Sequence, residues 1–395
     1  MRQPIFYLSI GLLLFLACKS DGITSKAEKP TLDTGIRVID SLNGFGYEIL
    51  DTAFTALVDI KAPIEILASG FQWSEGPVWV PAINSLIFND VPNNVTYRWG
   101  PKSFTAEGEN SLPKPVGIVT EKGSILGVDT FLYPSGYISD PGIKGEAGAN
   151  GLILDKEGRL WLAQHGERQV AIWGGIFENF IARRVEREST GSRRTYAETT
   201  FTTVINDYEG GKFNSPNDLV LADNGDLYFT DPTYGIDQTF GEDARELGIT
   251  GVYRVKKGSS RAELLYSGLL RPNGVVMTRD QKYFIVSSSE SKRSLWMKCD
   301  ASSEPMAEAD RCKLFADVTS LRSEQNSGNC DGMVMHPSGI MLATGPGGVL
   351  CFSESGKHLG TIRTGRPTAN VTLGGPDGKD IFITANQLLL RTRVH

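Results

Sequence analysis

Six side chains that end in an oxygen-bearing group recur along this chain, each at the start of a short apolar segment. They are Glu75, Asn150, Asn217, Asn273, Asp331 and Asn370. Carboxylate and amide oxygens are hard ligands that suit Ca²⁺, with its roughly 6–8 oxygen ligands, and less readily Mg²⁺. Six such oxygens gathered at one place would hold a divalent cation. An Asn or Asp at a strand start also bonds backbone groups of a turn, so a structural role stays open at each position.

Each opening is followed by a pattern that predicts a β-hairpin. The copy at Asn217, NDLVLADNGDLYFT, has two apolar strands around a polar turn. In five copies the residue eight positions after the opening falls in that turn, and in one of these it is Gln281. In the other four it is a glycine: Gly158, Gly225, Gly339 and Gly378. Glycine supplies the positive φ that a tight hairpin turn needs.

The spacing of the openings predicts how the hairpins are arranged. Successive openings lie 75, 67, 56, 58 and 39 residues apart, which is enough for four strands in every interval but the last. Four-stranded sheets around a common axis form a β-propeller. The short last interval predicts a ring closed by both chain ends, with ITANQLLLRTRV near the C-terminus beside a strand from the N-terminus. We expect an all-β, six-bladed β-propeller with four-stranded blades and a central metal site.

Composition supports one large all-β domain. The 44 glycines among 395 residues suit many turns, and helical periodicity is nearly absent after the first twenty residues. Lys and Arg number 40 against 46 Asp and Glu, which gives a net charge of −6 with no basic block. We therefore expect no nucleic-acid partner, because phosphate binding needs clustered positive charge.

Residues 1–17 predict a lipoprotein signal peptide. Arg2 provides a positive head, and the apolar run that follows is shorter than the roughly 20 residues of a membrane span. The run ends in FLAC, which resembles the bacterial lipobox, at which Cys18 becomes lipidated. An ordinary cleaved signal with a chance cysteine is the alternative.

The remaining chain divides into two predicted parts. Residues 18–50 are expected to form a lipid-anchored flexible tether, because they are poor in apolar residues, and residues 51–395 the propeller. Lys19 replaces the Asp that retains such proteins at the inner membrane, which favours the outer membrane. The expectation is an exported periplasmic or cell-envelope lipoprotein that meets the membrane only through its N-terminal lipid anchor.

An exported protein can form disulfides. Cys299 and Cys312 flank the polar loop CDASSEPMAEADRC between two strand-like segments, so we expect them to form a disulfide. Cys330 and Cys351 lie in or beside apolar segments and are expected to be small core residues. The chain has no CxxC or paired Cys/His spacing that would indicate a zinc site of that kind.

Familiar catalytic motifs are missing from the sequence. It contains no GxSxG, no HExxH and no Walker loop, and none of its four histidines pairs at short spacing. The repeated oxygens are therefore the main chemical feature of the chain.

Motifs around these oxygens resemble those of the SMP-30/gluconolactonase/luciferin-regenerating enzyme family, in its bacterial gluconolactonase-like branch. They include SEGPVW, NSPNDL, YFTDPTYGI, RPNGVV and CDGM, and the resemblance extends from about Asp51 to the C-terminus. It implies a six-bladed propeller with one divalent metal, Ca²⁺ in the first place and Mg²⁺, Mn²⁺ or Zn²⁺ as alternatives. The implied ligands are Glu75, Asn217, Asn273 and Asp331.

Other predicted positions surround that metal. Asn150 is expected to face the substrate, whereas Asn370 is expected to have a structural role near ring closure. His165 and Asp231 follow the second strands of their hairpins and are expected to line the rim of the pocket as substrate-binding residues, with a structural hydrogen-bonding role as the alternative.

The resemblance implies a gluconolactonase-like hydrolase with a small-molecule lactone as substrate. A metal that polarises a lactone carbonyl needs a base for the attacking water, and Asp331 is the candidate, with simple charge neutralisation as its other possible role. Animal members carry an arginine two residues before the ligand equivalent to Asn217, where this chain has Ser215, so sugar recognition must differ. The alternatives are an organophosphate or phosphotriester hydrolase on the same metal site and a non-catalytic binding propeller.

Overall fold

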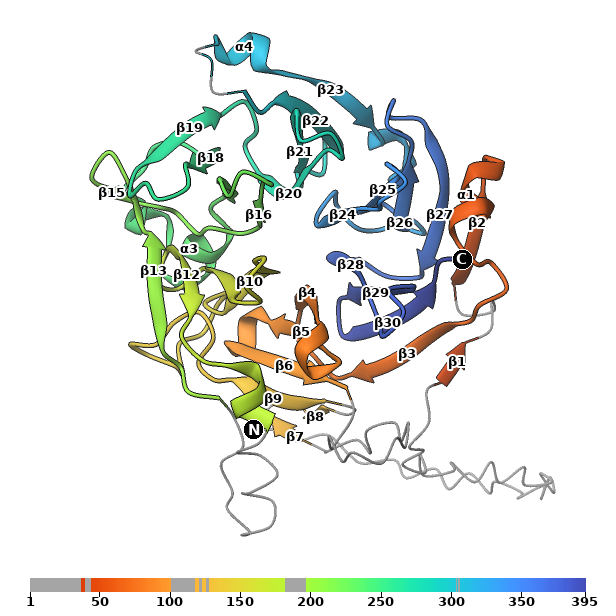
Figure 1. The fold of residues 1–395 in the computed structure, drawn as a ribbon, viewed down its shortest axis with the longest axis horizontal. Coiled ribbons are helices and arrows are strands. Elements are labelled where there is room, and N and C mark those ends of the chain that lie inside the picture. The colour runs from red at the N-terminus through yellow and green to blue at the C-terminus, as the bar shows by residue number, and fades with distance from the viewer. Residues whose placement is uncertain are drawn as a thin grey trace, which may run out of the picture. The chain divides into compact units, whose positions relative to one another are not determined.

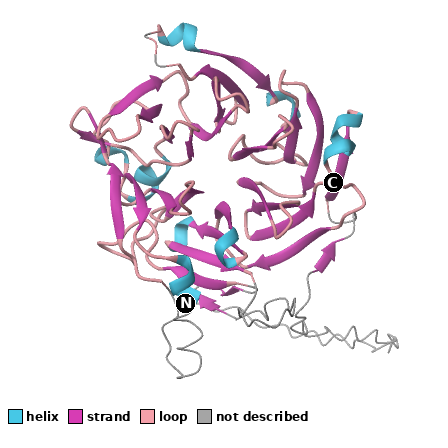
Figure 2. Ribbon diagram, viewed as in Figure 1, coloured by secondary structure: helices cyan, strands magenta, loops and turns pink. Residues whose placement is uncertain are grey.

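A computed structural model of the chain describes residues 37–39, 44–100, 118–120, 123–125, 128–181, 197–302, 304 and 306–395. All of them belong to one compact unit, Thr34–His395. Its strands are arranged as sheets around a common axis, with few helices (Figures 1 and 2). None of the helices in the described parts of the chain is long and apolar enough to cross a membrane.

The described residues form a six-bladed β-propeller with four-stranded blades, which confirms the predicted fold class. From the axis outward, the first three blades are β4 (Ser74–Val80), β5 (Ser85–Asp90), β6 (Val95–Trp99) and β9 (Asp129–Leu132); β10 (Ala149–Leu154), β11 (Leu160–Gln164), β12 (Gln169–Trp173) and β13 (Phe201–Ile205); and β16 (Leu219–Leu221), β17 (Leu227–Asp231), β18 (Gly251–Val255) and β19 (Ala262–Tyr266).

The last three blades are β20 (Pro272–Met277), β21 (Tyr283–Ser288), β22 (Leu295–Asp300) and β23 (Cys312–Asp317); β24 (Met333–Met335), β25 (Met341–Gly345), β26 (Gly348–Phe352) and β27 (His358–Thr364); and β28 (Asn370–Gly374), β29 (Asp380–Ala385), β30 (Leu388–Arg393) and β3 (Ile64–Ser69). Outside the blades lie α1 (Thr52–Leu57), α3 (Tyr234–Thr239), α4 (Glu308–Arg311) and the short ribbons β7 (Ile118–Thr120) with β8 (Gly123–Ile125) and β14 (Asp207–Tyr208) with β15 (Gly211–Lys212).

The hairpin turns have the backbone conformation that the repeat predicted. All five predicted turn residues have positive φ, from +59° at Gln281 to +90° at Gly339. The first two strands of a blade therefore meet in a tight turn at the end far from the repeat opening. Gln281 adopts this conformation without being glycine, and its side chain bonds the backbone of Asp223 and Thr278.

The ring is closed by both chain ends, as predicted. The last three strands of the chain form the inner part of the sixth blade, and β30 pairs with β3, which enters from the N-terminal side. A further strand, β1 (Arg37–Ile39), pairs with β3. Strands far apart in sequence thus share one sheet, which fixes the last blade against the first (Figure 1).

The predicted start of the propeller at residue 51 is too late. Strand β2 (Phe45–Ile49) pairs along β27 and adds a fifth strand to the outer edge of the fifth blade. The segment is short and polar enough to look like tether. Its backbone nevertheless pairs with the N–H and C=O groups at the outer edge of β27. Local composition does not reveal this contact. The predicted signal peptide and Cys18 lie outside the described residues.

Apolar side chains between neighbouring blades form the core. One cluster joins the third and fourth blades through Tyr228, Val252, Phe284 and Val286, all of them buried. The rings of Tyr228 and Phe284 lie 5.5 Å apart across this junction. Packing between the faces of neighbouring sheets therefore stabilises each blade against the next and leaves the strand starts at the axis for polar residues.

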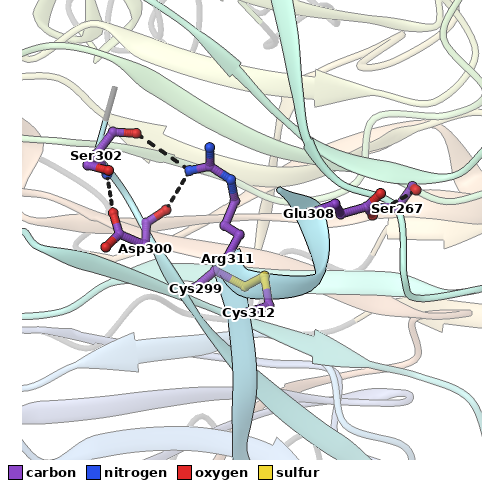
Figure 3. Close-up of a disulfide and its surroundings, with 7 residues drawn as sticks. All are labelled: Ser267, Cys299, Asp300, Ser302, Glu308, Arg311 and Cys312. Carbon is purple, nitrogen blue, oxygen red and sulfur yellow. Dashed lines mark hydrogen bonds between the residues drawn. A yellow bond between two sulfur atoms is a disulfide. The ribbon is translucent and has the colours of Figure 1, made fainter. Parts of the chain in front are cut away.

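Two cysteines on the outer side of the fourth blade are joined. Cys299 on β22 and Cys312 on β23 face each other in the register of the two strands and form a disulfide (Figure 3). Beside it, Arg311 donates a hydrogen bond to the carbonyl of Asp300 (2.9 Å). Cys330 and Cys351 are buried free thiols, as expected for small core residues.

Replacing Cys299 and Cys312 together by serine should lower the free energy of unfolding, because the bridge closes a loop with a sequence separation of 13 residues. Loop-closure entropy sets an upper value of ~3 kcal/mol for such a loop. Urea denaturation with and without a reductant measures it. The double variant, which serves as the control, should not respond to the reductant. Equal stability of the oxidised and reduced wild-type protein would contradict this prediction.

Candidate metal centre

The six repeated oxygens lie at the starts of the six innermost strands. Glu75, Asn150, Asn273 and Asn370 are inside β4, β10, β20 and β28. Asn217 and Asp331 come two residues before β16 and β24. Because innermost strands surround the axis, the structure brings all six positions to the same end of it.

Close backbone contacts hold these strand starts together. The N–H of Gly151 donates to the carbonyl of Asn217 (2.7 Å), and the Thr230 hydroxyl donates to that of Asn273 (2.6 Å). A Cβ on Gly76 would lie 2.0 Å from the Asn150 carbonyl oxygen, so no other residue fits there. The glycines that follow several of the repeated oxygens thus permit a narrow ring.

Glu75 is almost fully buried and its carboxylate has three donors. The Trp73 indole N–H donates to Oε1 (3.1 Å), while the Gly76 N–H (3.2 Å) and the Asn370 side-chain amide (3.5 Å) donate to Oε2. Burial raises the pKa of Glu75, and the charge of Asp218 raises it further. Asn370 therefore fixes a predicted ligand, which agrees with the structural role expected for it.

The orientation of Asn217 is set by His165. His165 Nδ1 lies 3.1 Å from the carbonyl oxygen of Glu146, which can only accept, so Nδ1 carries the proton. The other ring nitrogen, Nε2, then accepts from Asn217 Nδ2 at 3.4 Å. Burial lowers the pKa of His165 to about 4, so the ring is neutral at ordinary pH. With its nitrogen bonded in this way, the amide of Asn217 has a free oxygen.

Asn273 is also oriented by a hydrogen bond from its side-chain nitrogen to a neighbouring acceptor. Its Nδ2 donates to the Ser289 hydroxyl (2.8 Å), and that hydroxyl donates in turn to the carbonyl of Cys330 (2.9 Å). Among the described residues, no hydrogen bond is made to Oδ1 of either Asn217 or Asn273. Two amide oxygens are thus left available as ligands, which is what a hard cation requires.

The carboxylates around the axis have raised pKa values. Burial raises the pKa of Asp331 well above its usual value, and the charges of Glu75, Asp218 and Glu146 add to the rise. Asp218 accepts from the N–H groups of Leu219 and Val275, yet burial raises its pKa to about 7. In the described parts of the chain, no Lys or Arg forms an ion pair with Glu75, Asp218 or Asp331. A divalent cation would offset this concentration of negative charge.

The donor set fits a calcium-like ion. Within the described residues, no group of three or more His, Cys, Asp or Glu side chains could hold a metal. A metal site here must therefore include amide oxygens. Two carboxylates, Glu75 and Asp331, and the amide oxygens of Asn217 and Asn273 make up the candidate set. Oxygens without imidazole or thiolate ligands match the chemistry of Ca²⁺ or Mg²⁺ better than that of Zn²⁺.

The other two predicted site residues differ in their surroundings. Asn150 is buried, and no hydrogen bond of its side chain is found within the described residues. Asp231 is completely buried beneath the site and accepts from the N–H groups of Asn214 (2.8 Å) and Ser215 (2.7 Å). Asp231 therefore fixes the loop before Asn217 and does not line the rim as predicted, because its oxygens are occupied by that loop.

His165 is not on the rim either. It is fully buried, and its Nε2 bonds the side-chain amide of Asn217. Five neighbours of the site were not predicted from the sequence, namely Trp73, Glu146, Asp218, Tyr234 and Ser289. Tyr234 lies within the motif YFTDPTYGI, and Trp73 directly precedes the motif SEGPVW. Their position in or beside a motif was the signal that could have identified them. Glu146 and Ser289 lie in stretches with no pattern that indicates a site.

The chain is similar in sequence to known proteins. A family model described as the SMP-30/Gluconolactonase/LRE-like region matches residues 183–387. A gluconolactonase of Zymomonas mobilis is 31% identical over 346 residues, which cover 86% of this chain and 83% of that protein.

Solved structures show the same fold. A gluconolactonase of Xanthomonas campestris aligns with a TM-score of 0.67 at 22% identity, covering 91% of this chain and 98% of that one. A calcium-binding protein, regucalcin, from Agrobacterium tumefaciens aligns with a TM-score of 0.52 at 15% identity, covering 89% and 95%.

Replacing His165 by alanine should weaken Ca²⁺ binding about 10- to 100-fold, which is typical when a residue that orients a metal ligand is lost. The amide of Asn217 would lose the acceptor that directs its oxygen. Calorimetric titration of metal-stripped protein with Ca²⁺ measures the effect. His336→Ala is the control, because His336 lies in a hairpin turn at the opposite end of its blade. Equal Ca²⁺ affinity in wild type and His165→Ala would show that Asn217 needs no such support.

Proposed function

Because the chain belongs to the SMP-30/gluconolactonase/LRE-like family, we propose that it is a divalent-metal-dependent lactonase that opens a sugar lactone by attack of water. The observation that supports this most directly is the pair of amides, Asn217 and Asn273, whose nitrogens are bonded and whose oxygens accept no hydrogen bond in the described parts of the chain. Together with the carboxylates of Glu75 and Asp331, these oxygens would form a site for a cation at the end of the axis.

The proposed ligands are Glu75, Asn217, Asn273 and Asp331, and Ca²⁺ is the first choice, with Mg²⁺, Mn²⁺ or Zn²⁺ as alternatives. When bound, such an ion supplies Lewis-acid polarisation of the lactone carbonyl and stabilises the negative charge that develops on its oxygen. Residues of the chain must then place the lactone and accept a proton from water.

Asp331 is better suited than Glu75 to accept that proton. Glu75 is 2% exposed, and its two oxygens already accept from three donors. Asp331 is only partly buried, and within the described residues its carboxylate accepts no hydrogen bond from another side chain. A water molecule can therefore approach Asp331, which we propose as general base as well as ligand.

We also propose that the protein is exported and attached to the cell envelope through a lipid on Cys18. The support comes from the sequence alone, through the apolar run that ends in FLAC and the polar segment that follows. A lactonase in that location would meet lactones outside the cytoplasm.

Asp331→Asn keeps the shape and one oxygen ligand but removes the proposed base. We expect hydrolysis of D-glucono-1,5-lactone to fall by about 100-fold or more, as for loss of a general base, while Ca²⁺ still binds. A pH-indicator assay measures the rate and calorimetry the binding. Asp223→Asn, at an exposed hairpin turn, is the control. Undiminished hydrolysis would overturn the role of Asp331 as base.

The same assay separates the alternatives for the site. Activity that survives exhaustive chelation would contradict metal dependence. A panel of aldono-, aromatic and acyl-homoserine lactones, with a phosphotriester beside them, tests the substrate class. The lactonase proposal would be contradicted if Ca²⁺-loaded protein hydrolysed only the phosphotriester. It would also be contradicted if that protein hydrolysed none of these compounds.

Cys18→Ser should move the protein from the membrane to the soluble fraction of the bacterial envelope or stop its processing, because a serine cannot receive the thioether-linked lipid. Fractionation followed by immunoblotting measures this. A Ser20→Ala variant, two residues further on, should keep the wild-type distribution. Membrane association that is the same with Cys18→Ser and wild type would contradict the lipid anchor.

A further inference from the structure

The first turn of α3 packs directly on the residues that orient the candidate metal ligands. A Cβ on Gly235 would lie 2.6 Å from the Cβ of His165, so the helix backbone touches that ring. The N–H of Gly235 also donates to the Ser215 hydroxyl (3.0 Å), two residues before Asn217. Tyr234, the first residue of α3, is therefore held beside the metal centre.

The hydroxyl of Tyr234 is buried, and no group of the described residues meets it at hydrogen-bonding distance and angle. Ser289 and Asn273 lie close enough to affect the phenol, as does the charge of Asp331. The Ser289 hydroxyl is already used, since it accepts from Asn273 and donates to Cys330. A buried hydroxyl without a partner is costly, and at this place a substrate oxygen would satisfy it.

Arg271 lies next to Tyr234 at the surface. Its guanidinium is 5.5 Å from the centre of the Tyr234 ring, within the range of a cation–π contact. The side chain is exposed, and no hydrogen bond or ion pair of the guanidinium occurs within the described residues. Its donors are therefore free to bind oxygens of a ligand that reaches the Tyr234 hydroxyl.

Ser215 cannot serve as the sugar-binding residue, although it occupies the position where a substrate arginine was expected. It is fully buried, its hydroxyl donates to the carbonyl of Pro232 (2.6 Å) and accepts from Gly235. In the next blade, Arg271 precedes Asn273 by two residues, just as Ser215 precedes Asn217. An arginine is thus present beside the site, but on a different blade.

We propose that Tyr234 and Arg271 form the substrate-recognition wall of this site, where they bind hydroxyl groups of a polyhydroxylated lactone. The Tyr234 hydroxyl donates to a hydroxyl oxygen near the lactone ring, and the Arg271 guanidinium binds an oxygen further out. This inference rests on the proposed lactonase function. It makes the protein selective for sugar lactones over lactones without hydroxyl groups.

The test compares two substrates that share a six-membered lactone ring, D-glucono-1,5-lactone and the unsubstituted δ-valerolactone. Tyr234→Phe should raise KM for the sugar lactone about 3- to 10-fold, the value of one neutral hydrogen bond, and leave kcat/KM for δ-valerolactone within about twofold. Arg271→Met should act in the same direction. If these side chains had only a structural role, their substitution would change the kinetic constants for both substrates equally. That result would overturn the proposal.

Two matched controls are available in the chain. Tyr253→Phe removes another buried hydroxyl without a partner, but Tyr253 stacks on Phe229 inside the third blade, so its kinetics should match the wild type. Arg279→Met removes an arginine beside a groove of about 340 Å³ between the fourth and fifth blades. A change in sugar-lactone KM with Tyr253→Phe as large as with Tyr234→Phe would contradict the assignment.

Binding of D-gluconate to Ca²⁺-loaded protein separates this inference from the proposed function. Calorimetry should give an affinity about 3- to 10-fold weaker for Tyr234→Phe than for wild type. The Ca²⁺ affinity itself should be the same for both proteins. If the wild type hydrolyses no lactone, the lactonase proposal fails, and weaker gluconate binding by the variant would still support the wall. The proposed recognition wall would be overturned if Tyr234→Phe and the wild type bound gluconate equally, or if the wild type bound none.

Discussion

The close approach of the six innermost strands at one end of the axis is the constraint on which the site depends. Backbone hydrogen bonds such as that from Gly151 to Asn217 bring neighbouring blades together there, and glycine after a repeated oxygen leaves room for the next blade. Because the strand starts are this close, side chains of neighbouring strand starts contact one another, as Asn370 contacts Glu75. Glu, Asn and Asp can then act together, although they are separated by tens of residues in the sequence.

The narrow ring also explains the electrostatics. Carboxylates brought this close in a buried place repel one another and lose solvation, so burial raises the pKa values of Glu75, Asp218 and Asp331. The fold tolerates this because N–H groups bond these oxygens and because inter-blade packing is extensive. A centre that is unfavourable by itself is one that a bound cation would stabilise, and the free energy that the centre costs in folding would then appear as affinity for the ion.

The orientation of the proposed ligands is fixed by hydrogen bonds with neighbouring residues. His165 and Ser289 bond the amide nitrogens of Asn217 and Asn273, and Trp73 bonds Glu75. His165 is held in turn by the carbonyl of Glu146, in the loop that contacts Thr239 of α3. The loop, the helix and the ligands therefore form one hydrogen-bonded assembly, and a change in α3 can affect the site without touching a ligand.

The sequence alone determined the hairpins, the number of blades, the closure by both chain ends and the positions of the six oxygens. These features follow from local alternation and from turn residues such as Gly158 and Gln281, whose backbone preferences act within a few residues. Only the tertiary structure decided that Asp231 and His165 lie behind the site, that Tyr234 lies beside it and that β2 belongs to a blade. Each of these depends on contacts between segments distant in sequence, such as β2 with β27, and such contacts leave no periodic pattern in the chain.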